Sequence, residues 1–286
     1  MEIILGKMAG FCPGVENAVK RANKELENSK EIYCLGELVH NKQVVDKLKS
    51  KGLQEIDSIK KAPKQSKVII RAHGVPKEVY QYAQENQIEL IDLTCGKVLR
   101  LHKIAEKYAT NGYYIILMGK ATHPENIGTI SFCGKNSSVI ENKEDIDKVI
   151  NKLKRTTLRK LAIISQTTFS TEKFEEYTDI LQQKIDFNME IEINNTICDA
   201  TRLRQEETKE IARQVELMII IGGKNSSNTT KLYELAIREC NNAMHVETTE
   251  DLYMNYVRRF KKIGVMAGAS TSQESIDEIM SILKRG

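Results

Sequence analysis

The sequence predicts an α/β fold of three similar lobes with mainly parallel sheets, in a pseudo-threefold arrangement around a central cavity. Short apolar runs rich in Ile, Leu and Val alternate with longer amphipathic patterns along the 286 residues, as is typical of parallel α/β units. Three cysteines, Cys12, Cys95 and Cys198, each end such a run just before a helical pattern. Six further turns join an apolar run to a helical pattern, two for each cysteine. This recurrence predicts one lobe repeated three times.

The repeated lobe consists, in order, of a strand, a polar turn, a helix, a short strand, a strand, a second polar turn, a helix and a last strand that ends in cysteine. Residues 13–96 form the first lobe and 97–196 the second. The third lobe, 197–286, ends after its helix TSQESIDEIMSILKRG and lacks the last strand. The N-terminal run 1–12, which contains EIILGKMAGFC, has the composition of that strand. We therefore expect it to complete the third lobe.

The polar turns follow strand-like runs in six segments: YCLGELVHNKQVV, VIIRAHGVPKEVY, YIILMGKATHPENIGT, AIISQTTFSTEKF, MIIIGGKNSSNTTKLYEL and IGVMAGASTSQES. In each segment a β-rich apolar run is a strand, the Gly, Ser, Thr, Asn or His residues form the turn, and the rest starts a helix. Their candidate functional residues are, in chain order, His40, His73, His123, Glu125, Thr167, Ser226, Ser227, Asn228 and Ser270. Because ligands bind at the carboxyl ends of parallel strands, we expect these residues and the three cysteines to face one cavity.

The composition is that of an ordinary soluble protein, with 29% charged and 41% hydrophobic residues. The net charge of +4 is spread over helical faces without a long basic block, so nucleic-acid binding has no support. No apolar run approaches the ~18 residues of a membrane span, and Glu2 argues against a signal peptide. These features predict a cytoplasmic protein that binds neither nucleic acid nor membrane.

The six cysteines include no CxxC pair and no short secreted framework, which favours a reducing compartment. Cys34, Cys133 and Cys240 lack the strand-end setting and are interpreted as ordinary buried or incidental thiols. Three thiolates that are remote in sequence favour a soft metal centre. The wide spacing is a weak zinc signature, because zinc usually takes its ligands from short local spacings. An iron–sulfur cubane held by three cysteines keeps one open iron, which can bind substrate as a Lewis acid.

The remaining turn residues predict an anionic substrate. Ser226, Ser227 and Asn228 precede a helix, where hydroxyls, an amide and backbone N–H groups suit phosphate oxygens, although such a run alone is equally typical of an N-cap. His40, His73 and Ser270 add donors from matching turns. Together these residues resemble a clamp for a diphosphate without a metal.

Glu125 is an acid among donor-rich turns. In a closed cavity beside an anion its pKa is expected to rise, which suits a proton donor, whereas an isolated glutamate here would simply interact with the helix dipole. Thr167 and His123 are candidates for a hydrogen-bond relay to it, and Thr168 is a second candidate hydroxyl.

The chain resembles the 4-hydroxy-3-methylbut-2-enyl diphosphate reductase family of the non-mevalonate isoprenoid pathway. The resemblance spans essentially the whole chain through motifs in the family's order: GFCPGV, LVHNKQVV, RAHGVP, LTC, THPENIGT, SQTTFS, NTICDATRLRQ, KNSSNT and AGAST. It departs from the family at Gly96-Lys97, where a proline is more usual, and at Thr122, where glycine is common. Altered packing of the turn at Cys95 or altered cluster stability is therefore expected, with the cysteine itself intact.

The resemblance implies a [4Fe–4S] cluster with one open iron, bound by Cys12, Cys95 and Cys198. It also implies roles for the polar turns: His40, His73, Ser226, Ser227, Asn228 and Ser270 hold the diphosphate, and His123, Glu125 and Thr167 surround the substrate hydroxyl. The implied reaction is a two-electron reductive dehydration to isopentenyl and dimethylallyl diphosphate, with a reduced ferredoxin or flavodoxin as electron donor.

Two other classes of function are compatible with parts of the pattern. A cluster-bearing redox sensor or electron carrier would account for the three cysteines but not for the polar turns. A hydrolase with zinc on the same cysteines and Glu125 as base would account for the acid but gives the serines no clear role.

Overall fold

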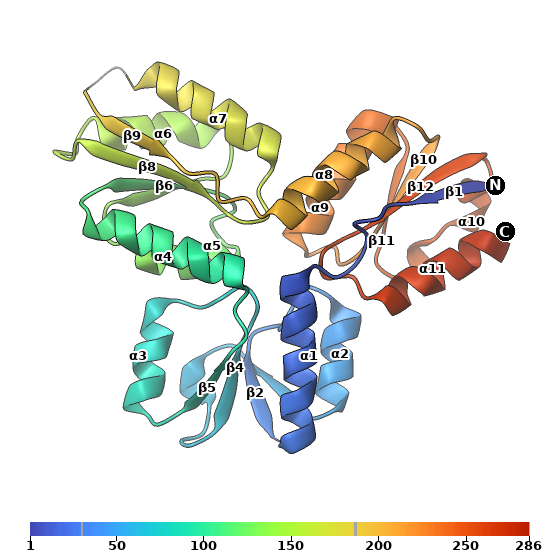
Figure 1. The fold of residues 1–286 in the computed structure, drawn as a ribbon, viewed down its shortest axis with the longest axis horizontal. Coiled ribbons are helices and arrows are strands. Elements are labelled where there is room, and N and C mark those ends of the chain that lie inside the picture. The colour runs from blue at the N-terminus through green and yellow to red at the C-terminus, as the bar shows by residue number, and fades with distance from the viewer. Residues whose placement is uncertain (30, 186–187, 286) are drawn as a thin grey trace. The chain divides into compact units, whose positions relative to one another are not determined.

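The computed structural model describes residues 1–29, 31–185 and 188–285 and divides into two compact units. The first unit comprises residues 1–23, 39–51 and 199–286, and the second comprises 24–38 and 52–198. Across the described residues there are three four-stranded sheets, all parallel, with helices between successive strands (Figure 1). The predicted α/β class with parallel sheets is confirmed.

The first unit contains one sheet in the order β1-β12-β10-β11. Its strands are β1 (Glu2–Leu5), β10 (Leu217–Ile221), β11 (Ala243–Val246) and β12 (Lys262–Ala267). Its helices are α2 (Lys42–Ser50), α8 (Asp199–Ala212), α9 (Ser227–Cys240), η2 (Thr249–Asp251), α10 (Met254–Val257), α11 (Gln273–Arg285) and the first part of α1 (Pro13–Asn28). The first strand of the chain thus pairs with its last strand, Glu2 opposite Lys262 and Leu5 opposite Val265.

The second unit contains two sheets, in the orders β3-β2-β4-β5 and β7-β6-β8-β9. The strands of the first are β2 (Ile32–Leu35), β3 (Leu53–Ile56), β4 (Lys67–Ile70) and β5 (Glu89–Asp92). Those of the second are β6 (Tyr114–Met118), β7 (Ser137–Ile140), β8 (Lys160–Ser165) and β9 (Glu190–Ile193). Its helices are η1 (Ile59–Lys61), α3 (Lys77–Glu85), α4 (Gly96–Thr110), α5 (Pro124–Phe132), α6 (Glu144–Leu153) and α7 (Thr171–Lys184).

The three sheets share one strand order. The first strand of each predicted repeat is β2, β6 or β10, and in its sheet it lies between the second and the third strands of that repeat. The strand that precedes a candidate cysteine is β5, β9 or β1, and it lies at one edge of its sheet. In the first unit β1 occupies that edge, where the sequence lacked a strand after α11. The lobe boundaries and the pseudo-threefold arrangement around a cavity stay predictions.

The core follows the binary pattern of the sequence. Every residue of β6 and β10 is buried, as expected for central parallel strands covered by helices on both faces. Helix α6 packs its apolar stripe, including Ile146 and Val149, against the sheet that contains β6. Over the described residues, no helix combines the length and apolar character that a membrane crossing requires.

Candidate functional site

The three candidate cysteines each lie just before a helix, as predicted. Cys12 precedes α1, Cys95 precedes α4 and Cys198 precedes α8. The same backbone contact holds all three, from Cys12 N to Ala269 O (3.0 Å), from Cys95 N to Ala72 O (3.0 Å) and from Cys198 N to Thr167 O (2.9 Å). Each acceptor is a candidate site residue or immediately precedes one, so every cysteine is tied to a polar turn on the adjacent strand.

The thiols of these cysteines suit a soft metal centre. All three are partly exposed, none is in a disulfide, and each lies at a helix N-terminus. The Sγ of Cys133, by contrast, donates to Thr129 O (3.4 Å), and burial raises its pKa to about 12. A thiol with such a pKa stays protonated, which agrees with the interpretation of Cys133 as an ordinary buried residue.

The turn at Cys95 keeps a regular geometry at Gly96. Helix α4 begins at Gly96, and Cys95 keeps the same N–H contact as the other two cysteines. A Cβ at position 96 would meet no heavy atom within 4 Å, so the glycine is not required there for a close approach of neighbouring atoms.

Glu125 lies in the first turn of α5 and is 2% exposed. Thr167, after β8, donates from its N to Oε1 (2.6 Å) and from its Oγ1 to Oε2 (2.7 Å) of this carboxylate. Burial raises the pKa of Glu125 to about 7, although both Thr167 bonds favour the charged form and oppose the rise. At neutral pH the carboxyl group therefore exists in both protonation states, as a proton donor requires.

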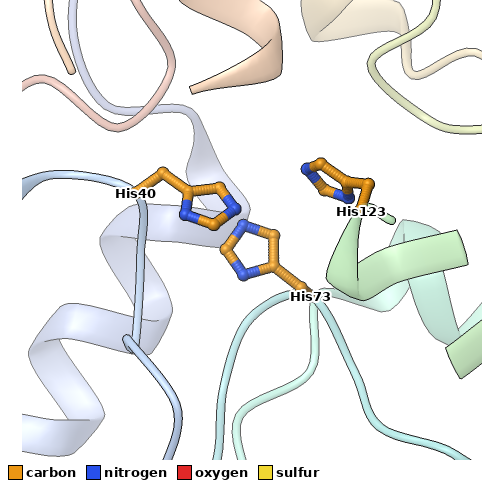
Figure 2. A group of neighbouring side chains, drawn as sticks. All are labelled: His40, His73 and His123. Carbon is orange, nitrogen blue, oxygen red and sulfur yellow. The ribbon is translucent and has the colours of Figure 1, made fainter. Parts of the chain in front are cut away.

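His123 and His73 lie near this acid in the second unit. His123 is the N-cap of α5, and its Nδ1 accepts a hydrogen bond from Glu125 N (3.1 Å). The rings of His73 and His123 lie edge to face with centroids 5.5 Å apart (Figure 2). Two imidazoles, an acid and a hydroxyl are thus grouped at the carboxyl ends of β4, β6 and β8.

Glu125 and Thr167 are flanked by a buried pair of amides. Asn126 Nδ2 donates to Gln166 Oε1 (3.0 Å) and to Lys120 O (2.8 Å), and Gln166 Nε2 donates to Thr168 Oγ1 (2.8 Å). Asn126 directly follows Glu125, and Gln166 directly precedes Thr167. The amide pair therefore connects the backbone that carries the acid to the backbone that carries its hydroxyl partner.

Glycine makes room for this amide pair. Gly119 has a φ of +157°, and a Cβ there would lie 2.5 Å from Asn126 Nδ2 and 2.7 Å from Gln166 Cβ. Because Cβ atoms essentially never approach so closely, a larger residue would push the amides apart.

Polar turns also meet in the first unit. Ser270 Oγ donates to His40 O (2.9 Å), and a Cβ on Gly223 would lie 2.9 Å from the same carbonyl oxygen. Ser226 is the N-cap of α9, its Oγ accepting from Thr229 N (3.3 Å). The turns after β10 and β12 thus lie against the segment that contains His40.

Asn228 has the least satisfied side chain of these turns. It is 4% exposed, and within the described residues neither its Nδ2 nor its Oδ1 has a hydrogen-bond partner. Leaving a buried polar group unsatisfied costs about 1–3 kcal/mol. An amide in this position is suited to a ligand that can both accept and donate hydrogen bonds.

Comparison with known proteins decides the family. The LytB protein family matches residues 3–284. The chain belongs to the LytB family. A relative from Alkaliphilus oremlandii named 4-hydroxy-3-methylbut-2-enyl diphosphate reductase is 40% identical over 283 residues, 98% of each chain. A relative of the same name from Aquifex aeolicus is 37% identical over 287 residues, 98% of this chain and 95% of its own.

Two solved structures of LytB-type reductases are also similar. One, described as the terminal enzyme of the non-mevalonate pathway, is 36% identical with a TM-score of 0.70 and full coverage of both chains. The other, from Plasmodium falciparum, is 29% identical with a TM-score of 0.91, covering 99% of this chain and 88% of its own. The resemblance inferred from the motifs is confirmed for the family and the fold.

The sequence reasoning missed the amide pair of this LytB protein. Asn126 and Gln166 stand in the segments THPEN and SQTTF, directly beside the predicted acid and hydroxyl. A detectable signal was present, because Gln166 directly follows the apolar run AIIS, at the strand end where the other predicted site residues lie.

His102 was missed as well. It is a buried imidazole two turns into α4, and it stacks on Phe132 of α5 with ring centroids 4.5 Å apart. Burial lowers its pKa to about 4, so it is neutral in the folded protein at physiological pH. Gly74 has a φ of +74°, and a Cβ there would lie 2.8 Å from the imidazole Cε1, which brings the turn after His73 against α4.

Proposed function

We propose that the protein catalyses the two-electron reductive dehydration of (E)-4-hydroxy-3-methylbut-2-enyl diphosphate to isopentenyl diphosphate and dimethylallyl diphosphate. Its place among the reductases of the non-mevalonate pathway follows from the family match and the full-length relatives. Two electrons and two protons enter, the allylic C–O bond breaks, and the hydroxyl leaves as water. The observation that carries the mechanism is the buried Glu125, with a pKa of about 7 and two bonds from Thr167.

Cys12, Cys95 and Cys198 would hold the [4Fe–4S] cluster implied by the resemblance. Their partly exposed thiols, each beside a helix N-terminus and a polar turn, provide a suitable donor set. When bound, such a cluster supplies the electrons and an open iron that acts as a Lewis acid towards the substrate hydroxyl.

The diphosphate would be held by His40, His73, Ser226, Ser227, Asn228 and Ser270. The N-terminus of α9 offers backbone N–H groups and a positive dipole end to the phosphate oxygens. Asn228 supports this assignment, because binding a phosphate oxygen would satisfy its buried Nδ2.

Glu125 would supply a proton to the leaving hydroxyl or to the allylic carbon. Its protonated form is stabilised by burial, and the carboxylate that remains after transfer is stabilised by the two hydrogen bonds from Thr167. His123 orients the acid through its bond from Glu125 N. The electrons would come from a reduced ferredoxin or flavodoxin in the cytoplasm.

The test is anaerobic turnover of this diphosphate by the cluster-reconstituted protein, with chemically reduced viologen as electron source and identification of the products. Formation of the two isomeric five-carbon diphosphates is expected. A protein with a full cluster that bound the substrate and yet formed neither product would refute the proposal.

A further inference from the structure

Helix α4 carries a row of positive charges on its exposed side. We call this row the α4 basic face, and its members are Lys97, Arg100, Lys103 and Lys107. The only other exposed residue from 96 to 107 is Gly96. Because residues three or four positions apart are neighbours on a helix, the four cations form one continuous strip.

No other α-helix in the described part of the chain has an exposed side of this kind. Every other α-helix with exposed charged residues carries at least one exposed carboxylate: Glu16, Asp46, Glu78, Glu144, Glu175, Glu206, Glu234 and Glu274 are examples from α1, α2, α3, α6, α7, α8, α9 and α11. The single carboxylate of α4, Glu106, is bound to Lys77 Nζ (2.5 Å). The α4 basic face is thus a concentrated positive surface, in contrast to the mixed charges elsewhere.

Two cations of this face are available to a partner. Within the described residues, neither Arg100 nor Lys103 forms an ion pair with a carboxylate, whereas Lys107 interacts electrostatically with Glu192. Exposed cations without counter-ions attract an acidic macromolecule and accelerate its association.

The α4 basic face starts beside a proposed cluster ligand. Cys95 is partly exposed, and Gly96 follows it with no side chain and with open space around its Cβ position. Lys103 lies about 12 Å further along the helix axis, from the usual rise of a helix. One interface patch can therefore cover both the cations and the backbone next to Cys95.

The other two cysteine helices are less suitable. Helix α1 carries exposed Glu16 in its first turn, and α8 carries exposed Glu206, which binds Arg202 through both carboxylate oxygens (2.8 and 3.0 Å). An acidic partner would meet repulsion or already neutralised charges there.

We propose that the α4 basic face docks an acidic one-electron carrier protein, a small iron–sulfur protein or flavoprotein, which delivers electrons on the side of Cys95. This inference rests on the proposed function, since that reaction consumes two electrons per substrate. Two one-electron deliveries oxidise two equivalents of the carrier and balance the loss of the hydroxyl as water. The positive face increases the rate of encounter and orients the carrier towards Cys95.

The test compares R100E/K103E with the matched variant K64E/K154E. The control makes the same change in net charge at two exposed lysines of the same unit, outside α4. Three quantities are measured for each protein: the Kd of an oxidised acidic ferredoxin by calorimetry, kcat/KM for that ferredoxin at low and high salt, and turnover with reduced viologen. An acidic flavodoxin is used in a parallel series.

R100E/K103E is expected to weaken carrier binding at least tenfold at low salt and to lower carrier-driven kcat/KM by a similar factor, with viologen-driven turnover within twofold of wild type. The salt dependence of carrier-driven turnover should largely disappear in this variant and persist in the control. Carrier binding within twofold of wild type, or an equal loss in the control, would overturn the docking proposal. A wild type that turns over with viologen but takes no electrons from either acidic carrier would overturn it as well, whereas failure with viologen counts against the proposed function itself.

Discussion

Replacing Glu125 with Gln tests the proposed proton donor most directly. The substitution keeps the size of the side chain but removes the acidic proton and leaves one of the two donor groups of Thr167 facing an amide NH₂. Loss of a general acid typically costs about two to four decades of turnover. At ~1.4 kcal/mol per decade, the activation free energy of the kcat step should rise by about 3–6 kcal/mol, with little change in KM.

The pH dependence sharpens this test. Because the donor must be protonated, wild-type kcat should fall as pH rises through about 7, the pKa that burial gives Glu125. E125Q should lose this limb and become flat there. Initial rates of product formation from pH 5.5 to 9, with reduced viologen as donor, measure both effects. The matched control is Glu175→Gln, an exposed residue of α7, which should behave as wild type.

Stability gives a second, independent readout. The pKa of Glu125 is raised in the folded state from its ordinary 4.5 to about 7. Its contribution to the free energy of unfolding is therefore fully present below about pH 4.5 and is lost as pH rises through 7, by roughly 3 kcal/mol in total. E125Q should lack this component of the pH dependence of stability.

Near-normal turnover of E125Q, or an unchanged alkaline limb of its kcat profile, would show that Glu125 is not the proton donor.

Three further predictions concern neighbours of the site. Thr167→Val removes the hydroxyl bond that favours the charged carboxylate, so the pKa of Glu125 should rise and the alkaline limb of kcat should move to higher pH in rate–pH profiles. Asn228→Leu removes a buried amide without partners in the described residues. Urea unfolding should show equal or greater stability, while calorimetry should show at least tenfold weaker binding of inorganic diphosphate; unchanged binding would contradict the assignment. Gln166→Leu breaks the bond from Asn126 and should lower the free energy of unfolding by about 1–3 kcal/mol in denaturant titrations. An unchanged free energy of unfolding would show that the amide pair does not stabilise the fold.

Much of the fold was predictable because the signals are local. Apolar runs such as those of β6 and β10, followed by glycine and polar residues, identify buried parallel strands without reference to the rest of the chain. The three cysteines were recognisable because each combines a strand end with a helix start.

The rest of the site depends on contacts between distant residues. The bonds between Glu125 and Thr167 join positions 42 residues apart, and only their burial together sets the pKa of the acid. Sequence spacing also could not distinguish a ligand-binding Asn228 from an ordinary helix-capping residue. The two differ in whether the side-chain amide forms a hydrogen bond within the protein, which only the structure shows.

The pairing of β1 with β12 constrains the order of events during synthesis. Glu2 to Leu5 are made 260 residues before their partners, Lys262 to Val265. At typical rates of ~5–20 residues per second, β1 waits on the order of 10–50 s before it can join its sheet. The contact of Cys12 with Ala269 waits equally long. Cys12 is thus the first of the three cysteines to leave the ribosome and the last to be fixed in place, so the complete set of three cysteines can form only after β12 has been made.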